Sequence, residues 1–254
     1  MMALSSESAF LYPVFRTFIV KKHIIMKKIV ILTGAGISAE SGVSTFRDSN
    51  GLWRNHRIEE VASPIAWENN RQLVLDFYNI RRKQLFEVEP NEGHKWLVKL
   101  EDKFDVQIIT QNVDDLHERA GSKNVLHLHG ELKKVRSTIN PELIYTLDNW
   151  KLDLGDNCEL GSQLRPHIVW FGESVPMIET AMHIASKADI FIVIGTSMVV
   201  YPAASLINYV GDNVEKYYID PAAFQVQGIS KLKIISEKAG IGVPRLVEEL
   251  LKKY

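Results

Sequence analysis

The chain has 254 residues, of which 46% are hydrophobic and 24% are charged, and its formal net charge at pH 7 is -1. This size is sufficient for a full core in one large domain, or in one domain with a smaller insert. The near-neutral charge excludes a global attraction to nucleic acid or to a membrane surface. The single cysteine, Cys158, excludes an intramolecular disulfide framework and a multi-cysteine metal site, and it fits the reducing cytoplasm.

The first 25 residues differ from the rest of the chain. The apolar run 9–20 contains Pro13 and Arg16, is too short to span a bilayer, and lacks the flanks of a signal peptide. We therefore expect a soluble protein whose folded unit begins near Met26, with residues 1–25 as an N-terminal extension. An anchoring role for this extension is the alternative.

An apolar run over residues 28–33 predicts a strand, and closely spaced glycines follow it. Gly34, Gly36 and Ala39 have the spacing of a turn that brings the backbone and a helix start close to a pyrophosphate. A nicotinamide dehydrogenase would continue with a strand ending in Asp or Glu about 20 residues on. Residues 41–53 are polar and aromatic instead, so the sequence predicts a nucleotide site that is not built for hydride transfer.

Short apolar runs then alternate with amphipathic stretches, which predicts an α/β fold with a Rossmann-like parallel sheet. The expected strands cover 106–110, 125–128, 190–194, 215–219 and 232–235, and the expected helices cover 91–102, 178–188 and 242–251. Two segments interrupt this rhythm: 54–92, which is helical and rich in charge, and 131–166, which has an irregular pattern. We assign both insertions to a smaller lobe, and residues 26–53, 93–130 and 167–254 to the nucleotide-binding domain.

Polar side chains follow two of the expected strands, where an open parallel sheet places its ligands. Gln111, Asn112 and Asp114 follow the strand at 106–110, and His129 follows the strand at 125–128. An unperturbed imidazole pKa near 6.5 suits proton abstraction at neutral pH, so His129 is the candidate general base. The alternative is that the amide and carboxylate cap a helix and the histidine is structural.

Several motifs together resemble the Sir2 (sirtuin) family of NAD-dependent protein deacylases, over roughly residues 28–251. The matching segments are 34–42, 45–47, 51–53, 110–114, 128–130, 165–166, 171–173, 195–197 and 202–203. The resemblance implies that NAD is consumed and that acyl-lysine proteins or peptides are the partners. The products would be free lysine, nicotinamide and O-acyl-ADP-ribose.

The resemblance also implies roles for individual residues. His129 would be the general base, and Asn112 and Asp114 would act with it at the nicotinamide end. At Asp220 the family more often carries a different residue pair, and the segment 195–197 alone would also fit an ordinary strand-to-helix turn. The implied NAD-binding residues are Gly34, Ala35, Gly36, Ser38, Ala39, Glu40, Thr45, Phe46, Arg47, Trp53, Gln111, Asn112, Val113, Asp114, Gly195, Thr196, Ser197, Ile219, Asp220 and Ala239.

The stretch Val169, Trp170, Phe171 and Gly172 resembles the family's peptide-binding segment, to which an extended substrate adds as a strand. The two aromatic residues would wall the tunnel for the acyl-lysine. The alternative is that they are ordinary core residues.

Tyr78 and Arg81 are three positions apart, so on a helix they share a face and offer a hydroxyl and a guanidinium to one carboxylate. The pair resembles the Tyr-x-x-Arg element of sirtuins that prefer succinyl, malonyl or glutaryl lysine, and Ala39 resembles the small residue that widens their acyl pocket. We therefore expect a desuccinylase and demalonylase that retains deacetylase activity. The alternative is a solvated basic face, because Arg82 and Lys83 follow at once.

The sequence departs from the family in the insertion 131–166, where most members carry two Cys-x-x-Cys pairs that hold a structural zinc. Only Cys158 is present, so no zinc is expected. This lobe would then either be mobile or pack around apolar residues of the insertion. These residues are Leu143, Ile144, Tyr145, Leu147 and Trp150.

Three other functions share parts of this pattern: a sirtuin-like NAD hydrolase, an ADP-ribosyltransferase, and a non-catalytic sensor of NAD or ADP-ribose. A sensor would not need the base His129 beside Asn112 and Asp114. Simple hydrolysis would not need the segment 171–173 or the pair formed by Tyr78 and Arg81. These features favour the deacylase.

Overall fold

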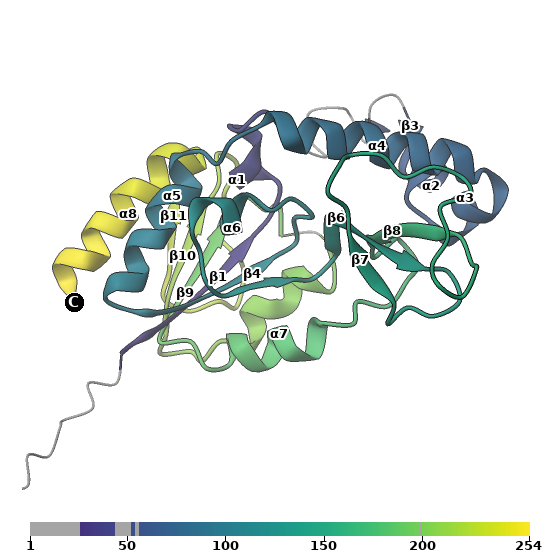
Figure 1. The fold of residues 1–254 in the computed structure, drawn as a ribbon. Helices are drawn as coiled ribbons and strands as arrows, with labels where there is room; N and C mark the ends of the chain where they lie inside the picture. The colour runs from purple at the N-terminus through teal and green to yellow at the C-terminus, as the bar shows by residue number, and fades with distance from the viewer. Residues whose placement is uncertain (1–25, 44–51, 54–55, 199) are drawn as a thin grey trace, which may run out of the picture.

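The computed structural model describes residues 26–43, 52–53, 56–198 and 200–254. At its centre is a six-stranded sheet in the order β11-β10-β9-β1-β4-β5, and every neighbouring pair is parallel (Figure 1). The predicted α/β, Rossmann-like fold is therefore confirmed. The strands are β1 (Lys28–Thr33), β4 (Asp105–Thr110), β5 (Val125–His127), β9 (Ile190–Ile194), β10 (Glu215–Ile219) and β11 (Leu232–Ile235).

Helices cover both faces of this sheet (Figure 1). On one face α5 (Glu92–Val98), which continues as a 3-10 turn over Lys99–Asp102, packs beside α8 (Ala239–Lys253). On the other face lie α7 (Ile178–Ala185) and the 3-10 helix η2 (Ala203–Tyr209). No helix in the described part of the chain is long and apolar enough to cross a membrane.

The last helix begins earlier than the expected start at residue 242. The main-chain N–H of Gly240 donates to Glu40 Oε2 over 2.6 Å, so a side chain from the other end of the sequence caps this helix. The first N–H groups of a helix have no acceptor within the helix, and here a carboxylate distant in sequence supplies one.

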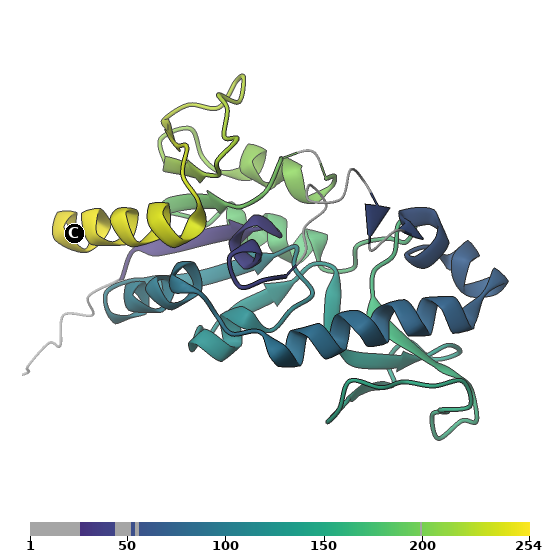
Figure 2. The same cartoon turned by 90° about the horizontal axis from the view of Figure 1, so that it is seen from above.

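The small lobe lies beside the carboxyl end of the sheet (Figure 2). Its helical part contains α2 (Ile58–Val61), α3 (Pro64–Asn69) and α4 (Arg71–Glu87), preceded by a two-stranded ladder of β2 (Leu52–Trp53) and β3 (His56–Arg57). The sequence predicted an irregular insertion at 131–166, but this segment forms an antiparallel sheet in the order β7-β6-β8. Its strands are β6 (Gly130–Ser137), β7 (Ile144–Thr146) and β8 (Leu164–Ile168).

Helix α4 joins the two insertions. Its first turn is capped by the Asn70 side chain, which accepts from Leu73 N over 3.0 Å. The fully buried Arg82 donates to the carbonyl oxygens of Leu132 and Trp150 over 2.6 and 2.7 Å, and to Asn79 Oδ1 over 2.8 Å. One guanidinium thereby ties the helix to β6 and to the loop that follows β7.

A polar cluster lies at the end of β6, within the insertion 131–166. The Cys158 thiol donates to Ser137 Oγ over 3.4 Å and lies 3.2 Å from Ser162 Oγ, and the two serine hydroxyls are 2.9 Å apart. Cys158 and Ser137 are buried. These contacts hold the end of β6 against the turn that precedes β8.

The apolar interior of this lobe differs in part from the expected set. Leu143, Tyr145 and Leu147 are half-buried and pack on the core, but Ile144 and Trp150 are 43% and 37% exposed. β7 pairs with only one neighbour, so alternate side chains of this edge strand face solvent. The core instead contains residues of β6, β8 and the loop before β8, namely Leu132, Val135, Leu152, Cys158, Leu164 and Ile168.

Candidate active site

A cavity of about 290 Å³ lies where the carboxyl ends of the strands meet the small lobe. Such a crevice is the usual ligand site of an open parallel sheet. Most of the predicted site residues line it. They are Gly34, Ala35, Gly36, Ser38, Tyr78, Arg81, Gln111, Asn112, Val113, Asp114, His129, Val169, Trp170, Phe171, Gly172, Gly195, Thr196 and Ser197.

Two glycine turns form one wall of the cavity. The turn after β1 donates from Gly36 N to Gly195 O over 2.8 Å, so it lies directly against the turn after β9. A Cβ on Gly36 would come within 2.6 Å of Gly195 Cα, and Gly195 has a φ of +62°. The glycines thus allow the two turns to touch. This contact is a second reason for glycine at these positions, beside the predicted close approach of a phosphate.

A buried polar network lies beneath the first turn. Asn112 Nδ2 donates to Gly34 O and to Ser38 Oγ, each over 3.1 Å, and Ser38 Oγ donates to Asp114 Oδ2 over 3.0 Å. Burial raises the pKa of Asp114 from its ordinary value, although the bond from Ser38 opposes the shift. The network fixes the loop after β4 against the glycine turn.

His129 follows β5 and lines the cavity. Its Nδ1 lies 3.0 Å from the carbonyl oxygen of Gln111, which can only accept, so Nδ1 carries the proton and Nε2 has the lone pair. Burial lowers the pKa of His129, and the bond to Gln111 opposes this only in part. The ring is therefore neutral at pH 7, as a general base must be.

Tyr78 and Arg81 of α4 reach the cavity from the small lobe. Trp170 Nε1 donates to the Tyr78 hydroxyl over 3.0 Å, and this hydroxyl still has its own proton to donate. Burial raises the pKa of Tyr78 to about 12, so the phenol stays protonated. The Arg81 guanidinium lies 5.7 Å from the ring centre of Phe77 on the same helix.

The segment after β8 is held by Glu173. Its carboxylate accepts from Trp170 N over 2.8 Å and from Arg165 Nη1 over 2.8 Å. Val169 N donates to His129 O, and Phe171 N donates to Ala62 O. The amides of residues 169–171 therefore already have partners. A substrate peptide that pairs here would donate its own N–H groups to main-chain carbonyl groups of this segment.

Five other predicted NAD-binding residues, all within the described part of the chain, do not line the cavity. Ala39 and Glu40 are exposed, and Glu40 caps α8. Ile219, Asp220 and Ala239 are buried at the end of β10 and the start of α8. Thr45, Phe46, Arg47 and the side chain of Trp53 lie outside the described residues.

Sequence reasoning missed several residues of the cavity wall. Gln84 and Leu85 follow Arg81 by three and four positions, a spacing that could have indicated them. Gln84 Nε2 also donates to Gly42 O over 2.8 Å and so joins α4 to the segment after α1 (Gly36–Ala39). Val43, Ala62 and Leu132 contribute apolar surface that no local pattern distinguishes from core.

No group of three or more metal-binding side chains occurs among the residues that the structure describes. The expectation that the protein carries no zinc stays a prediction.

Comparison with known proteins identifies relatives along most of the chain. The Sir2 family profile matches residues 34–202. An "NAD-dependent protein deacylase" of Helicobacter pylori is 54% identical over 227 residues, which are 89% of this chain and 99% of the relative. A protein of the same name from Bacteroides thetaiotaomicron is 51% identical over 231 residues, covering 89% of this chain and 99% of the relative.

Solved structures show the same similarity. The crystal structure of a Sir2 homologue in complex with NAD has a TM-score of 0.80 and 41% identity, and the match covers 90% of this chain and 91% of that one. A structure described as the structural basis for sirtuin substrate affinity has a TM-score of 0.70 at 28% identity, covering 90% and 93% of the two chains. The chain therefore belongs to the Sir2 family of deacylase enzymes.

Proposed function

We propose that this enzyme uses NAD to remove acyl groups from protein lysine side chains, with a preference for acyl groups that end in a carboxylate and with residual activity on acetyl-lysine. The observation that carries the preference is the presence of Tyr78 and Arg81 in the same cavity as His129. The names of the similar relatives support the coarser activity.

The residues present fit NAD as the second substrate. The backbone turns at 34–36 and 195–197 and the hydroxyls of Thr196 and Ser197 form a wall without bulky side chains, which suits a pyrophosphate and its riboses. When bound, NAD supplies the ADP-ribose unit that accepts the acyl group and loses nicotinamide. Asn112 and Asp114 would hold the nicotinamide end.

His129 would take up the proton of a ribose hydroxyl on Nε2. Its Nδ1–H bond to Gln111 O fixes the tautomer, and its lowered pKa keeps the ring neutral. The acid limb of the activity profile would follow the protonation of this ring, because the protonated form cannot act as a base. Removal of the acyl group leaves the lysine amine free.

The acyl carboxylate would bind between the Tyr78 hydroxyl and the Arg81 guanidinium. A hydroxyl that stays protonated and a guanidinium that stays charged both donate to a carboxylate at neutral pH. Ala39 is exposed and does not line the cavity formed by the described residues, so its assignment to the acyl pocket stays a prediction. The substrate backbone would pair through carbonyl groups near Val169.

The test compares two substrates in one variant. Arg81→Met should lower kcat/KM towards succinyl-lysine about 10- to 100-fold, because charge-assisted hydrogen bonds contribute roughly 1.5–3 kcal/mol. Acetyl-lysine has no carboxylate, so its kcat/KM should hardly change. Lys83→Met is the matched control, since Lys83 is exposed on the same helix and does not line the cavity.

Mass spectrometry of the peptides and of the NAD-derived products gives both efficiencies. An equal fall for the two substrates in Arg81→Met, or a wild type indifferent to succinyl-lysine, would remove the acidic-acyl preference. NAD consumption without any deacylated peptide would instead favour the hydrolase.

A further inference from the structure

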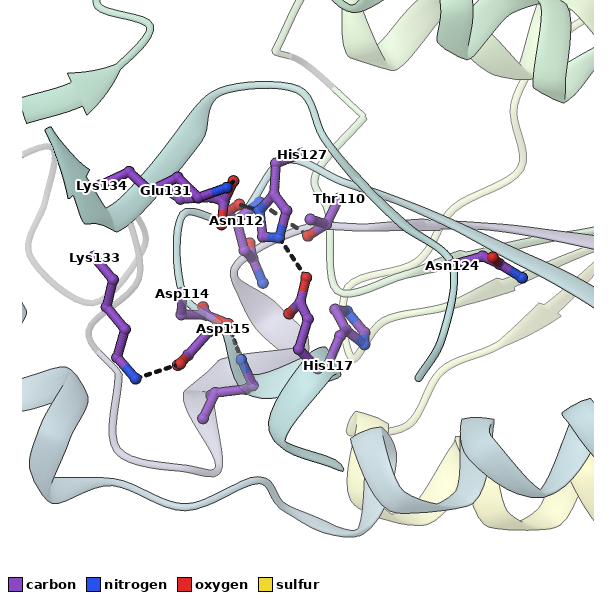
Figure 3. A network of polar contacts seen from close by, with 12 residues as sticks. Thr110, Asn112, Asp114, Asp115, His117, Asn124, His127, Glu131, Lys133 and Lys134 are labelled. Carbon is purple, nitrogen blue, oxygen red and sulfur yellow. Dashed lines mark hydrogen bonds and ion pairs between the residues drawn. The ribbon is translucent and has the colours of Figure 1, made fainter. Parts of the chain in front are cut away.

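His127 is the last residue of β5 and lies two positions before His129. Its side chain is only 8% exposed. Figure 3 shows its ring beside Asn112. No role in binding or catalysis follows from its position in the sequence, but its contacts join the loop after β4 to α6 (Leu116–Ala120).

Both ring nitrogens of His127 face oxygen atoms that can only accept. Nδ1 lies 3.1 Å from the main-chain carbonyl oxygen of Asn112, and Nε2 lies 2.7 Å from Glu118 Oε1. A neutral imidazole has a single N–H and can satisfy only one of them. With Glu118 ionised, as its lowered pKa favours, the geometry favours the doubly protonated, positively charged ring.

The charges around the ring agree with this protonation state. Burial alone would lower the pKa of His127, but the hydrogen bond and charge of Glu118 outweigh it and the pKa is raised. The pKa of Glu118 is lowered by the same contact, against the effect of burial. The ionisable groups that face the ring are Glu118 and His117 on α6, Asp114 on the preceding loop, and Glu131 on β6, which is paired with Lys134 over 2.6 Å.

We propose that His127 is a positioning residue of the active site: as an imidazolium held by Glu118, it fixes the main chain of Asn112, and its deprotonation sets the alkaline limit of activity. This inference rests on the proposed function. Asn112 in turn holds Gly34 and Ser38 through its side chain, so a shift of its carbonyl is transmitted to the wall of the cavity.

Loss of the proton has a defined structural result. The N–H that remains stays with Glu118, because a hydrogen bond to a carboxylate is the stronger one. The Nδ1 lone pair then faces the lone pairs of the Asn112 carbonyl, and this contact becomes repulsive. The effect is opposite in sign to that of His129, whose protonation would remove activity at low pH.

The test measures kcat/KM against pH for the whole protein with its best acyl-lysine substrate. In Glu118→Gln the alkaline limb should move to lower pH by about one unit or more, the scale on which a neighbouring opposite charge shifts a pKa. Its acid limb should not move, and near the acid limb its efficiency should stay within about twofold of wild type. Glu248→Gln, which removes a carboxylate exposed on α8, is the matched control and should leave both limbs in place.

His127→Asn gives a second arm. An asparagine amide places a donor near the position of Nδ1 that does not titrate, so the alkaline limb should disappear or move to higher pH. A uniform fall in activity at every pH in both variants, with the limbs unmoved, would reduce His127 to a structural role and overturn the proposal.

A direct readout does not depend on activity. In wild type, NMR of the imidazole nitrogens should show both His127 nitrogens protonated below pH 6.5, with a titration midpoint above 6.5. A neutral ring at pH 6.5 would overturn the proposal even if the enzyme is active. Absence of NAD-dependent deacylation at every pH would instead reject the proposed function, because the NMR result stands apart from it.

Discussion

The parallel sheet and the small lobe reach a stable interior through different contacts. In β9 all five residues are buried apolar side chains, and β1 beside it contributes four more from Ile29 to Leu32, so burial is spread over many side chains. In the small lobe the fully buried Arg82 bonds to two main-chain carbonyls, and Cys158 lies in a cluster with two serines. Burial distributed over many residues tolerates substitution, whereas a few polar contacts make a region depend on particular atoms.

The same contrast separates the two ends of the cavity. The sheet supplies the groups that would act on every substrate, namely His129 and the loop after β4. The small lobe supplies the groups that would distinguish one acyl chain from another. Substitutions on the two sides should therefore differ in kind as well as in size.

The largest effect is expected on the sheet side. His129→Ala should lower deacylation ~100-fold or more for succinyl-lysine and acetyl-lysine alike, because it removes the general base. NAD binding, measured by calorimetry, should persist. His183→Ala, on the exposed side of α7, is the control. Turnover near the wild-type rate, or a loss confined to one acyl type, would contradict the assignment.

The next effect concerns stability. Burial lowers the pKa of Arg82 to about 10, so the guanidinium is charged at pH 7 and donates to three acceptors. Arg82→Met should lower the free energy of unfolding by about 3 kcal/mol or more, since each buried acceptor left without a donor costs about 1–3 kcal/mol. Urea titration measures this value, and Lys83→Met should stay close to wild type.

Limited proteolysis locates the damage in this variant. Cleavage should begin within residues 131–166 while the fragments of the sheet stay intact. Simultaneous loss of both lobes would show that they unfold as one unit and would remove the contrast drawn above.

The smallest effect is expected from metal removal. Elemental analysis should find no stoichiometric zinc in the purified protein, and a strong chelator should leave both activity and stability unchanged. Ser137→Ala should cost about 1 kcal/mol or more with or without the chelator, because its buried hydroxyl takes part in four hydrogen bonds. One tightly bound zinc per chain would show that the cluster around Cys158 does not replace a metal.

The parallel sheet and the small lobe also differ in how much of each could be predicted from the sequence. The strands of the sheet have continuous apolar runs, and their ends carry Asn112, Asp114 and His129, so the fold and one side of the cavity could be predicted. The sheet of the small lobe could not, because the adjacent Lys133 and Lys134 interrupt the alternation of β6 and its partners are distant in sequence. The cap on α8 by Glu40 and the bond from Gln84 to Gly42 depend on tertiary contacts that have no local signal.

The position of β1 in the sheet has a consequence for synthesis on the ribosome. β1 pairs with β4 on one side and with β9, residues 190–194, on the other, and α1 is joined to α8 through Glu40 and Gly240. The central sheet therefore cannot be complete before residue 235, the end of β11, has been made, since such long-range pairings must wait for their partners. The described strands of the small lobe are all present once residue 168 has emerged. The small lobe, which depends on a few polar contacts, can therefore form before the central sheet, which depends on many apolar ones.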